Sequence, residues 1–451
     1  MARRTPTRVS VPGAKFIREL DGISEYRLEK NGLRILLAPD PYAPVVGFMV
    51  TYHVGSRNEA IGYTGATHLL EHLMFKGSKH FNKQKKNTIW EILETKGALV
   101  NATTWNDRTN YYEVVPREHL KAAVALEADR MRHAYIREED RQSEMTVVRN
   151  EFERGENSPM EALDKQIWAL AYQAHPYHHS TIGWRSDIEQ VPIARLKQFY
   201  DDFYWPDNAT VSVVGGLEVK EALAMIVKAF GVHPPKKGGY LPMYTEEPRQ
   251  EGERRAIVSR AGNTDMVGVA HKIPSATHDD LPALVILLII LSHGKTSRLY
   301  RALVDSAKAI DVSANCFQFR DPSLLITYVT LVPGVTHEEA EAVVKAEYRK
   351  IAEKGVTKLE LDRAKRAIRA YLASRRDGPY VFLSALNEEI ATGDWTRFST
   401  FPNRLAQVTS KAVQMVAKQY LVDDQSTTLY FKAAISPMKK QFGSRTKKPL
   451  L

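Results

Sequence analysis

Cysteine is almost absent from this sequence. One residue in 451 is a cysteine, Cys316, and this excludes an intramolecular disulfide and a zinc site built from several cysteines. We expect Cys316 to be a small buried hydrophobic residue. Because no disulfide can form within the chain, the cysteine content does not indicate an oxidising or a reducing compartment.

Long apolar runs are also missing. The strongest run, residues 281–291, is too short to span a bilayer and contains Pro282, so it predicts a buried helix. The basic N-terminus is not followed by the apolar segment of a secretory signal. We therefore expect a cytoplasmic protein, or a periplasmic one if a signal peptide has been removed from the sequence.

Neither sign of charge dominates strongly. Lys and Arg number 63 against 53 Asp and Glu, which gives a formal net charge of +10. The basic residues are spread along the chain and form no stripe interleaved with aromatics, so we do not expect nucleic-acid binding. Hydrophobic residues make up 43% and charged residues 26%, which is ordinary for a globular protein.

The length predicts more than one domain, because a single hydrophobic core rarely grows this large. Strands and helices follow each other in a similar order in both halves, which indicates two related α/β domains of an α+β protein. Proline, glycine and charged residues between the halves indicate a linker. The predicted segments are a basic N-terminal segment (1–20), a first domain that contains the metal motif (21–232), a linker (233–253), a second homologous domain (254–436) and a disordered basic tail (437–451).

The most informative motif is His68-Leu69-Leu70-Glu71-His72. The surrounding residues predict a helix, and residues four apart lie on one helical face. His68 and His72 can therefore offer two imidazoles to one metal ion, with the Glu71 carboxylate beside them. Two histidines suit zinc, and a carboxylate that is not itself a ligand can act as a general base. The alternative is a histidine pair that is satisfied inside the core.

Two carboxylates further along the chain could complete this site. Glu144 and Glu151 are seven residues apart on a long predicted helix, and therefore share a face. One of them could be a third ligand while the other orients a ligand. The alternative is that these are ordinary solvated surface charges, which we expect of Glu153 and Glu156.

A second histidine group stands near Pro176. His175, His178 and His179 lie in a predicted loop without helical spacing, and we do not expect metal binding there.

Together these motifs resemble the pitrilysin family of zinc peptidases, which includes insulysin and mitochondrial processing peptidase. The resemblance implies half of a clamshell made of two related domains, and a zinc-dependent endopeptidase of the inverzincin type. The segments that carry it are His68-x-x-Glu71-His72, Asn101-Ala102-x-Thr104, Thr109-x-Tyr111-Tyr112, Glu144, Val148-x-x-Glu151 and Thr296-Ser297-Arg298-Leu299-Tyr300.

The resemblance also implies a role for each matching residue. The ligands of one zinc ion would be His68, His72 and Glu151, and the Val148-x-x-Glu151 context favours Glu151 over Glu153. Glu71 would be the general base and Glu144 the carboxylate beside a ligand. Asn101 and Ala102 would hold the peptide backbone at a sheet edge.

One part of the family pattern is missing. Members carry an Arg and a Tyr seven apart in the second half, where this sequence has Val304 and Asp311. The nearest substitutes are Arg320 and Tyr328. We therefore expect a heterodimer with a homologous subunit that carries the Arg/Tyr pair, or else a homodimer. The alternative function is a non-catalytic subunit in a larger complex.

Overall fold

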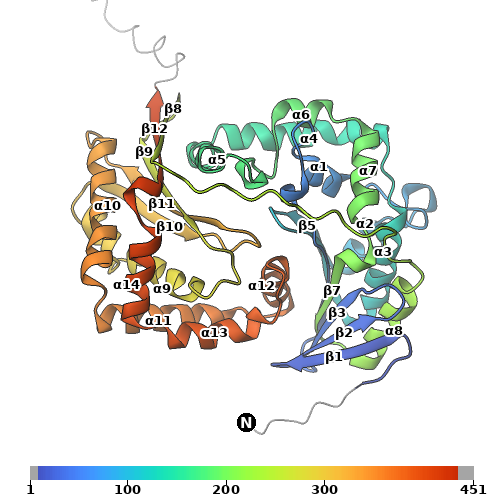
Figure 1. Ribbon diagram of the computed structural model, residues 1–451. Helices are drawn as coiled ribbons and strands as arrows, with labels where there is room; N and C mark the ends of the chain where they lie inside the picture. The colour runs from blue at the N-terminus through green and yellow to red at the C-terminus, as the bar shows by residue number, and fades with distance from the viewer. Residues whose placement is uncertain (1–8, 435–451) are drawn as a thin grey trace, which may run out of the picture. The chain divides into compact units, whose positions relative to one another are not determined.

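The computed structural model describes residues 9–434, so the predicted tail at 437–451 lies outside the described residues. The chain forms two compact units (Figure 1). Unit 1 contains Met1–Asn150, His179–Thr245 and Ala370–Pro402, and unit 2 contains Glu151–His178, Glu246–Arg369 and Asn403–Leu451. Each unit therefore includes segments from both halves of the sequence. The domain bounds predicted above divide the chain into consecutive segments, and they stay a prediction.

Unit 1 is built on a seven-stranded sheet in the order β1-β2-β3-β7-β4-β6-β5. The strands are β1 (Ala14–Leu20), β2 (Ile23–Leu28), β3 (Arg34–Pro39), β4 (Val45–Tyr52), β5 (Leu99–Thr104), β6 (Thr109–Pro116) and β7 (Ala209–Gly215). Neighbouring strands are antiparallel except β3 and β7, which are parallel.

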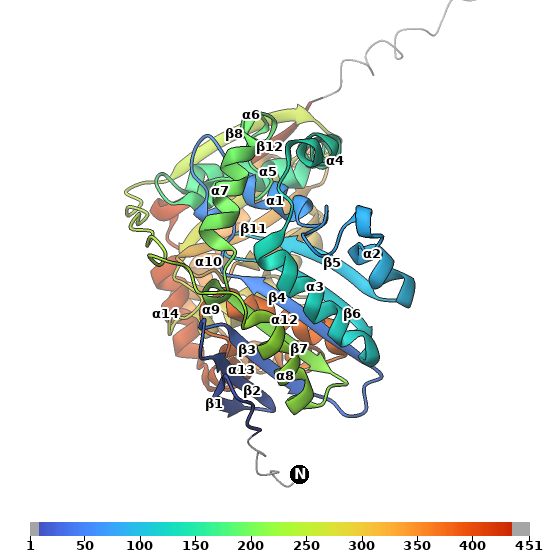
Figure 2. The ribbon, with the colours of Figure 1, turned by 90° about the vertical axis from the view of Figure 1, so that its right-hand side faces the viewer.

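Helices cover both faces of this sheet. Figure 2 shows α3 (Leu120–His133) and α8 (Val219–Phe230) running along the sheet. Phe48 of β4 contacts Phe230 of α8, whereas Met49 packs in a cluster with α12 (Pro379–Ala391). Successive strand residues point to opposite faces, so α8 and α12 cover opposite sides of the sheet. The other helices of this unit are α1 (Ala66–Leu73), α2 (Ile89–Ile92), α6 (Arg185–Gln190) and α7 (Ile193–Phe203).

Unit 2 is built on a five-stranded sheet in the order β10-β11-β9-β12-β8. Its strands are β8 (Arg254–Ala261), β9 (Met266–Ile273), β10 (Ala309–Cys316), β11 (Ser323–Leu331) and β12 (Ser426–Ala434). Only β8 and β12 pair in parallel. Its helices include α5 (Pro159–Ala171), α9 (Leu281–Ser292), α10 (His337–Lys354) and α14 (Ser410–Tyr420), while α4 (Glu138–Glu156), α11 (Lys358–Ser374) and α13 (Arg397–Gln407) cross the boundary between the units.

The two sheets share one topology. The order β3-β7-β4-β6-β5 in unit 1 corresponds to β8-β12-β9-β11-β10 in unit 2, and the parallel pair falls at the same place in both. The β1–β2 hairpin is an addition to unit 1. The prediction of an α+β fold with two related α/β domains is therefore confirmed.

Each sheet is covered on one face by a helix from the other half of the sequence. In unit 1, a Cβ at Gly47 of β4 would come within 2.5 Å of the Leu383 side chain on α12. In unit 2, a Cβ at Gly268 of β9 would come within 2.2 Å of the Ile167 side chain on α5. Glycine is thus used at corresponding strands to let the exchanged helix approach closely.

The sequence analysis missed several elements. Strands β1, β8 and β10 were not predicted from the sequence. The three missed strands lie at sheet edges, where alternate residues face solvent and the apolar signal is weak. Cys316, expected to be buried, is half-buried on β10.

Candidate metal centre

Helix α1 is anchored at its N-terminus by a buried carboxylate. Glu59 accepts hydrogen bonds from the backbone N–H groups of Gly65 and Thr67, both at 2.7 Å. Gly65 has a φ of 83°, and a Cβ there would meet the Ile182 carbonyl oxygen at 2.4 Å. Burial raises the pKa of Glu59 to about 8, despite the hydrogen bonds from Thr67 and Gly65 that oppose this shift. These contacts therefore fix the start of α1, on the N-terminal side of its two histidines.

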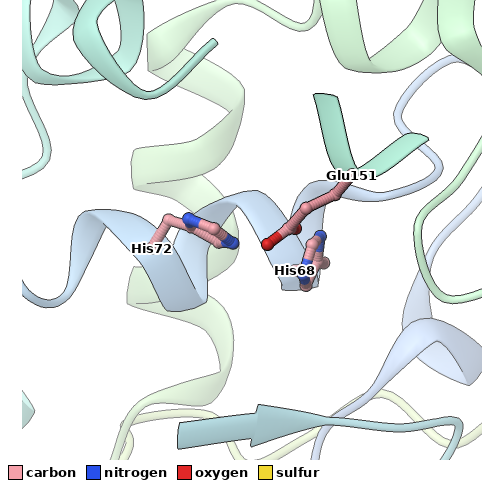
Figure 3. Close-up of side chains that lie close together, drawn as sticks. All are labelled: His68, His72 and Glu151. Carbon is pink, nitrogen blue, oxygen red and sulfur yellow. The ribbon is translucent and has the colours of Figure 1, made fainter. Parts of the chain in front are cut away.

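The three residues predicted as ligands come together in the structure. One ligand atom from each of His68, His72 and Glu151 lies within 4.8 Å of the others. Figure 3 shows the Glu151 carboxylate of α4 pointing toward the two imidazoles of α1. Glu153, the alternative ligand, is exposed and is not part of this group. Two imidazoles and a carboxylate are a typical set of protein ligands for a catalytic zinc ion, so these residues fit the metal.

Glu144 determines how His72 is oriented. Nδ1 of His72 lies 3.0 Å from Oε2 of Glu144, and the other oxygen of this carboxylate pairs with Lys76. Burial alone would raise the pKa of Glu144, but the hydrogen bonds from Lys76 and His72 outweigh it and lower the pKa. An ionised carboxylate can only accept, so Nδ1 of His72 is the donor and Nε2 carries the lone pair that a metal needs.

Helix α4 carries both Glu144 and Glu151. It runs without interruption from Glu138 to Glu156, and Glu151 follows Glu144 by two turns on the same face. The contact between Glu144 and His72 therefore also fixes the position of Glu151 along the axis of α1.

The environment of His68 favours its neutral form. Burial, together with the neighbouring His72, lowers the pKa of His68 to about 3. The two rings meet edge to face, with their centroids 4.8 Å apart. A neutral imidazole keeps a lone pair for a metal at physiological pH.

Glu71 is buried beside the predicted ligands His68 and His72, with 9% of its surface exposed. The hydroxyl of Thr104, at the end of β5, donates a hydrogen bond of 2.6 Å to Oε2 of Glu71. The carboxylate therefore has a fixed orientation at the ligand pair.

Asn101 and Ala102 lie on β5, which forms an edge of the unit 1 sheet. They pair with Tyr112 and Tyr111 of β6, and among the described residues no strand lies on their other side. The Ala102 N–H donates to the side-chain oxygen of Asn101 at 2.9 Å. The Asn101 side-chain oxygen thus occupies the position beside the Ala102 N–H that the carbonyl oxygen of another strand could take.

In unit 2, Val304 and Asp311 stand where the family pattern has an Arg and a Tyr. Val304 ends a short π-helix at Tyr300–Val304, and Asp311 is exposed on β10. Arg320 is exposed after β10. The hydroxyl of Tyr328 is bonded to Asp164 of α5 within the core of this unit, and burial together with Asp164 raises the pKa of Tyr328. Tyr328 is therefore already committed to a structural contact.

The histidines near Pro176 have separate partners. His175 lies 3.0 Å from Asp321, and His178 contacts the backbone oxygen of His175 at 3.0 Å. His179 lies 3.7 Å from Glu59, the residue that holds the start of α1.

Sequence reasoning missed three supporting residues: Glu59, Lys76 and Thr104. Thr104 belongs to a motif that the sequence analysis quoted, but its contact with Glu71 depends on where β5 ends relative to α1. Lys76 follows His72 by four residues, which is the one signal that could have placed it near Glu144.

Comparison with known proteins identifies the family. A family model described as "Insulinase (Peptidase family M16)" matches residues 34–184, and one described as "Peptidase M16 inactive domain" matches residues 190–368. The chain is 30% identical over 408 residues to "Zinc protease PqqE" of Helicobacter pylori, which covers 89% of this chain and 91% of that protein. This chain belongs to peptidase family M16.

Two further comparisons also cover most of the chain. The chain is 28% identical to "Probable mitochondrial-processing peptidase subunit beta" of Schizosaccharomyces pombe, over 87% of this chain and 88% of that protein. A crystal structure of a protease from Helicobacter pylori superimposes with a TM-score of 0.86 at 28% identity, over 91% of this chain and 99% of that one. No helix within residues 9–434 is long and apolar enough to cross a membrane.

Proposed function

We propose that this M16 chain is a zinc-dependent endopeptidase subunit that cleaves peptides or unfolded segments. The observation that carries the proposal is the meeting of His68, His72 and Glu151 around one point, with Glu71 beside them. The names of the relatives, which include several zinc proteases, agree with a protease-type function.

The division of labour among the residues follows from their contacts. When bound by the three ligands, zinc supplies a Lewis acid that polarises a carbonyl and acidifies water. Glu71 takes a proton from the attacking water and returns it to the nitrogen of the leaving amine as the peptide C–N bond breaks. Thr104 keeps the Glu71 carboxylate oriented, and Glu144 keeps His72 in the tautomer that can bind a metal.

Substrate binding is proposed at β5. An extended peptide can add to a sheet edge through backbone hydrogen bonds, which recognises the backbone before the side chains. The peptide's carbonyl oxygen would replace the Asn101 oxygen that now caps the Ala102 N–H. This mode of binding requires an unfolded substrate segment.

We further propose that a homologous subunit completes the site. One relative is named as a beta subunit, and this chain carries Val304 and Asp311 where the family pattern has an Arg and a Tyr. Removing one preorganised oxyanion donor typically costs about 10²–10³ in rate. An aspartate near a developing negative charge would oppose the reaction further, since like charges repel strongly away from water.

The test is peptide hydrolysis followed by mass spectrometry, with and without a chelator. We expect weak hydrolysis by the chain alone and strong hydrolysis with an M16 partner that has the Arg/Tyr pair and lacks the zinc motif. His68→Ala should remove the zinc ion held by His72 and Glu151 together with the activity. If the chain binds zinc but hydrolyses no peptide, either alone or with the partner, the result would instead indicate a non-catalytic subunit.

A homodimer predicts a different result. The chain alone would then hydrolyse peptides strongly, and Arg320→Ala would abolish that activity. Tyr328→Phe is the matched control, because the Tyr328 hydroxyl is already bonded to Asp164.

A further inference from the structure

Unit 1 contains a second group of potential metal ligands away from helix α1. His80, Asp129 and His133 each offer one ligand atom, and these atoms lie within 4.8 Å of one another. Asp129 and His133 are one turn apart on α3, and His80 lies in the loop that follows α1. None of the three residues belongs to the motifs of the peptidase site.

The contacts within this group converge on one carboxylate oxygen. Nδ1 of His80 lies 2.6 Å from Oδ1 of Asp129, and Nδ1 of His133 lies 3.0 Å from the same oxygen. The second oxygen, Oδ2, accepts hydrogen bonds from the Ser78 hydroxyl at 2.6 Å and the His80 backbone N–H at 2.9 Å. Asp129 is therefore oriented by two groups that would stay in place if a cation bound to Oδ1.

The backbone around the group is held independently of the histidines. Lys79 N–H donates to the His133 carbonyl at 3.1 Å, and Tyr135 N–H donates to the Gly77 carbonyl at 2.9 Å. Ser78 forms an isolated β-bridge with Ala134. The loop and the end of α3 are thus fixed to each other, so the three side chains converge without further ordering of the chain.

Charge and access both allow a cation. Burial would raise the pKa of Asp129, but hydrogen bonds from Ser78, His80 and His133 outweigh it and lower the pKa, so the carboxylate is ionised at neutral pH. The C-terminal end of a helix, where His133 lies, also attracts positive charge. The side chains of His80 and His133 are 56% and 38% exposed, whereas that of Asp129 is 7% exposed. A cation can therefore reach the group from solvent.

We propose that His80, Asp129 and His133 form a second metal site, for a divalent cation of the zinc type. Ligand atoms in a tetrahedral zinc site lie about 3.3 Å apart, so each Nδ1 needs to move away from Oδ1 of Asp129 by less than about 1 Å. Each Nδ1 then gives up its proton, which moves to Nε2 in a neutral ring, and uses its lone pair for the metal. Three protein ligands leave a fourth position for water.

The affinity should be lower than at the peptidase site. Lys79, Lys83 and Lys85 lie in the same loop and raise the cost of placing a cation there. The bound cation would tie the loop after α1 to the end of α3 through side chains as well as backbone.

The experiment is zinc stoichiometry by plasma emission after dialysis against buffered free zinc in the micromolar range. The full chain should bind two zinc ions, and His80→Ala and His133→Ala should each bind one. His68→Ala, which removes the peptidase site, should still bind one ion, and the double variant His68→Ala/His80→Ala none. His293→Ala is the matched control, because His293 is an exposed histidine in unit 2.

His80 is the first residue to change, because its exposed side chain makes misfolding of the variant unexpected. Cobalt substitution in the His68→Ala background gives a second readout, in which the d–d absorption of bound cobalt should disappear on His80→Ala. Equal zinc content in the wild type and His80→Ala would overturn the proposal and leave Asp129 as an anchor for the loop. The His68→Ala background keeps this outcome separate from any failure of the proposed peptidase function.

Discussion

The contact between Glu144 and His72 allows a quantitative prediction about zinc affinity. In Glu144→Gln, the side chain keeps its shape but loses its charge, and its amide nitrogen must face either His72 or the Lys76 ammonium, both of which are donors. The imidazole of His72 then loses the partner that holds its proton on Nδ1. We therefore expect weaker zinc binding with little change in the fold.

Two independent estimates give the size of the effect. A hydrogen bond to a charged group contributes about 1.5–3 kcal/mol, and the Glu144 side chain is only 13% exposed, so little of this is lost to solvent. Removing a group that orients a metal ligand typically weakens binding by about 10- to 100-fold, which corresponds to about 1.4–2.7 kcal/mol. Both point to a zinc dissociation constant raised by one to two powers of ten.

The assay is zinc competition against a fluorescent chelator. Glu153→Gln is the matched control, because Glu153 lies on the same helix and is exposed. We expect Glu153→Gln to bind zinc like the wild type and Glu144→Gln to bind it about 10- to 100-fold more weakly. A change of less than threefold in Glu144→Gln would refute the reasoning, and a loss of zinc in Glu153→Gln would transfer the ligand role from Glu151 to Glu153.

Three further predictions follow from the contacts described above. Glu71→Gln should keep its zinc and lose about 10²–10⁴ in kcat, as measured by peptide hydrolysis, because the amide cannot accept a proton. Thr104→Val should lower kcat about 10-fold at unchanged KM and zinc content, since it removes the 2.6 Å hydrogen bond that orients Glu71. Glu247 has its pKa lowered to about 2, because hydrogen bonds from Lys272 and from the backbone N–H groups of residues 173–175 outweigh its burial. Glu247→Gln should therefore lower the free energy of unfolding in urea by about 1–2 kcal/mol above pH 5. The difference from wild type should vanish as the pH falls from about 4.5 to 2, because the wild-type carboxylate is then protonated. The control Glu246→Gln should have no such effect.

Part of the candidate metal site could be predicted because its geometry is local. His68 and His72 are one turn apart on one helix, and Glu144 and Glu151 are two turns apart on another, so helical periodicity alone pairs them. The order of the motifs along the chain then linked the two helices. Periodicity left open which carboxylate joins His68 and His72, and the resemblance to the pitrilysin family selected Glu151; the structure brings these three residues together, and their role as ligands stays a prediction.

The supporting contacts could not be predicted, because they join residues whose separation depends on tertiary structure. Thr104 reaches Glu71 because β5 ends beside α1, and no local pattern encodes that distance. The pattern of apolar residues also does not show that α12 packs on the unit 1 sheet and α5 on the unit 2 sheet, each from the other half of the sequence. An amphipathic helix shows which of its faces is buried but not which sheet covers that face.

The duplicated topology explains why the two units differ in chemistry. In unit 1 the connection from β4 to the edge strand β5 contains α1, with its two histidines and Glu71. In unit 2 the corresponding connection, from β9 to the edge strand β10, contains α9, whose sequence Leu-Pro-Ala-Leu-Val-Ile-Leu-Leu-Ile-Ile-Leu-Ser offers no ligand and is mostly buried. A helix that is apolar on all sides fills a core and cannot present a carboxylate and imidazoles to a cation. The same strand order therefore carries two histidines and Glu71 in one connection and a packed apolar helix in the other, and this apolar helix lies within residues 190–368, which match the "inactive domain" model of the family.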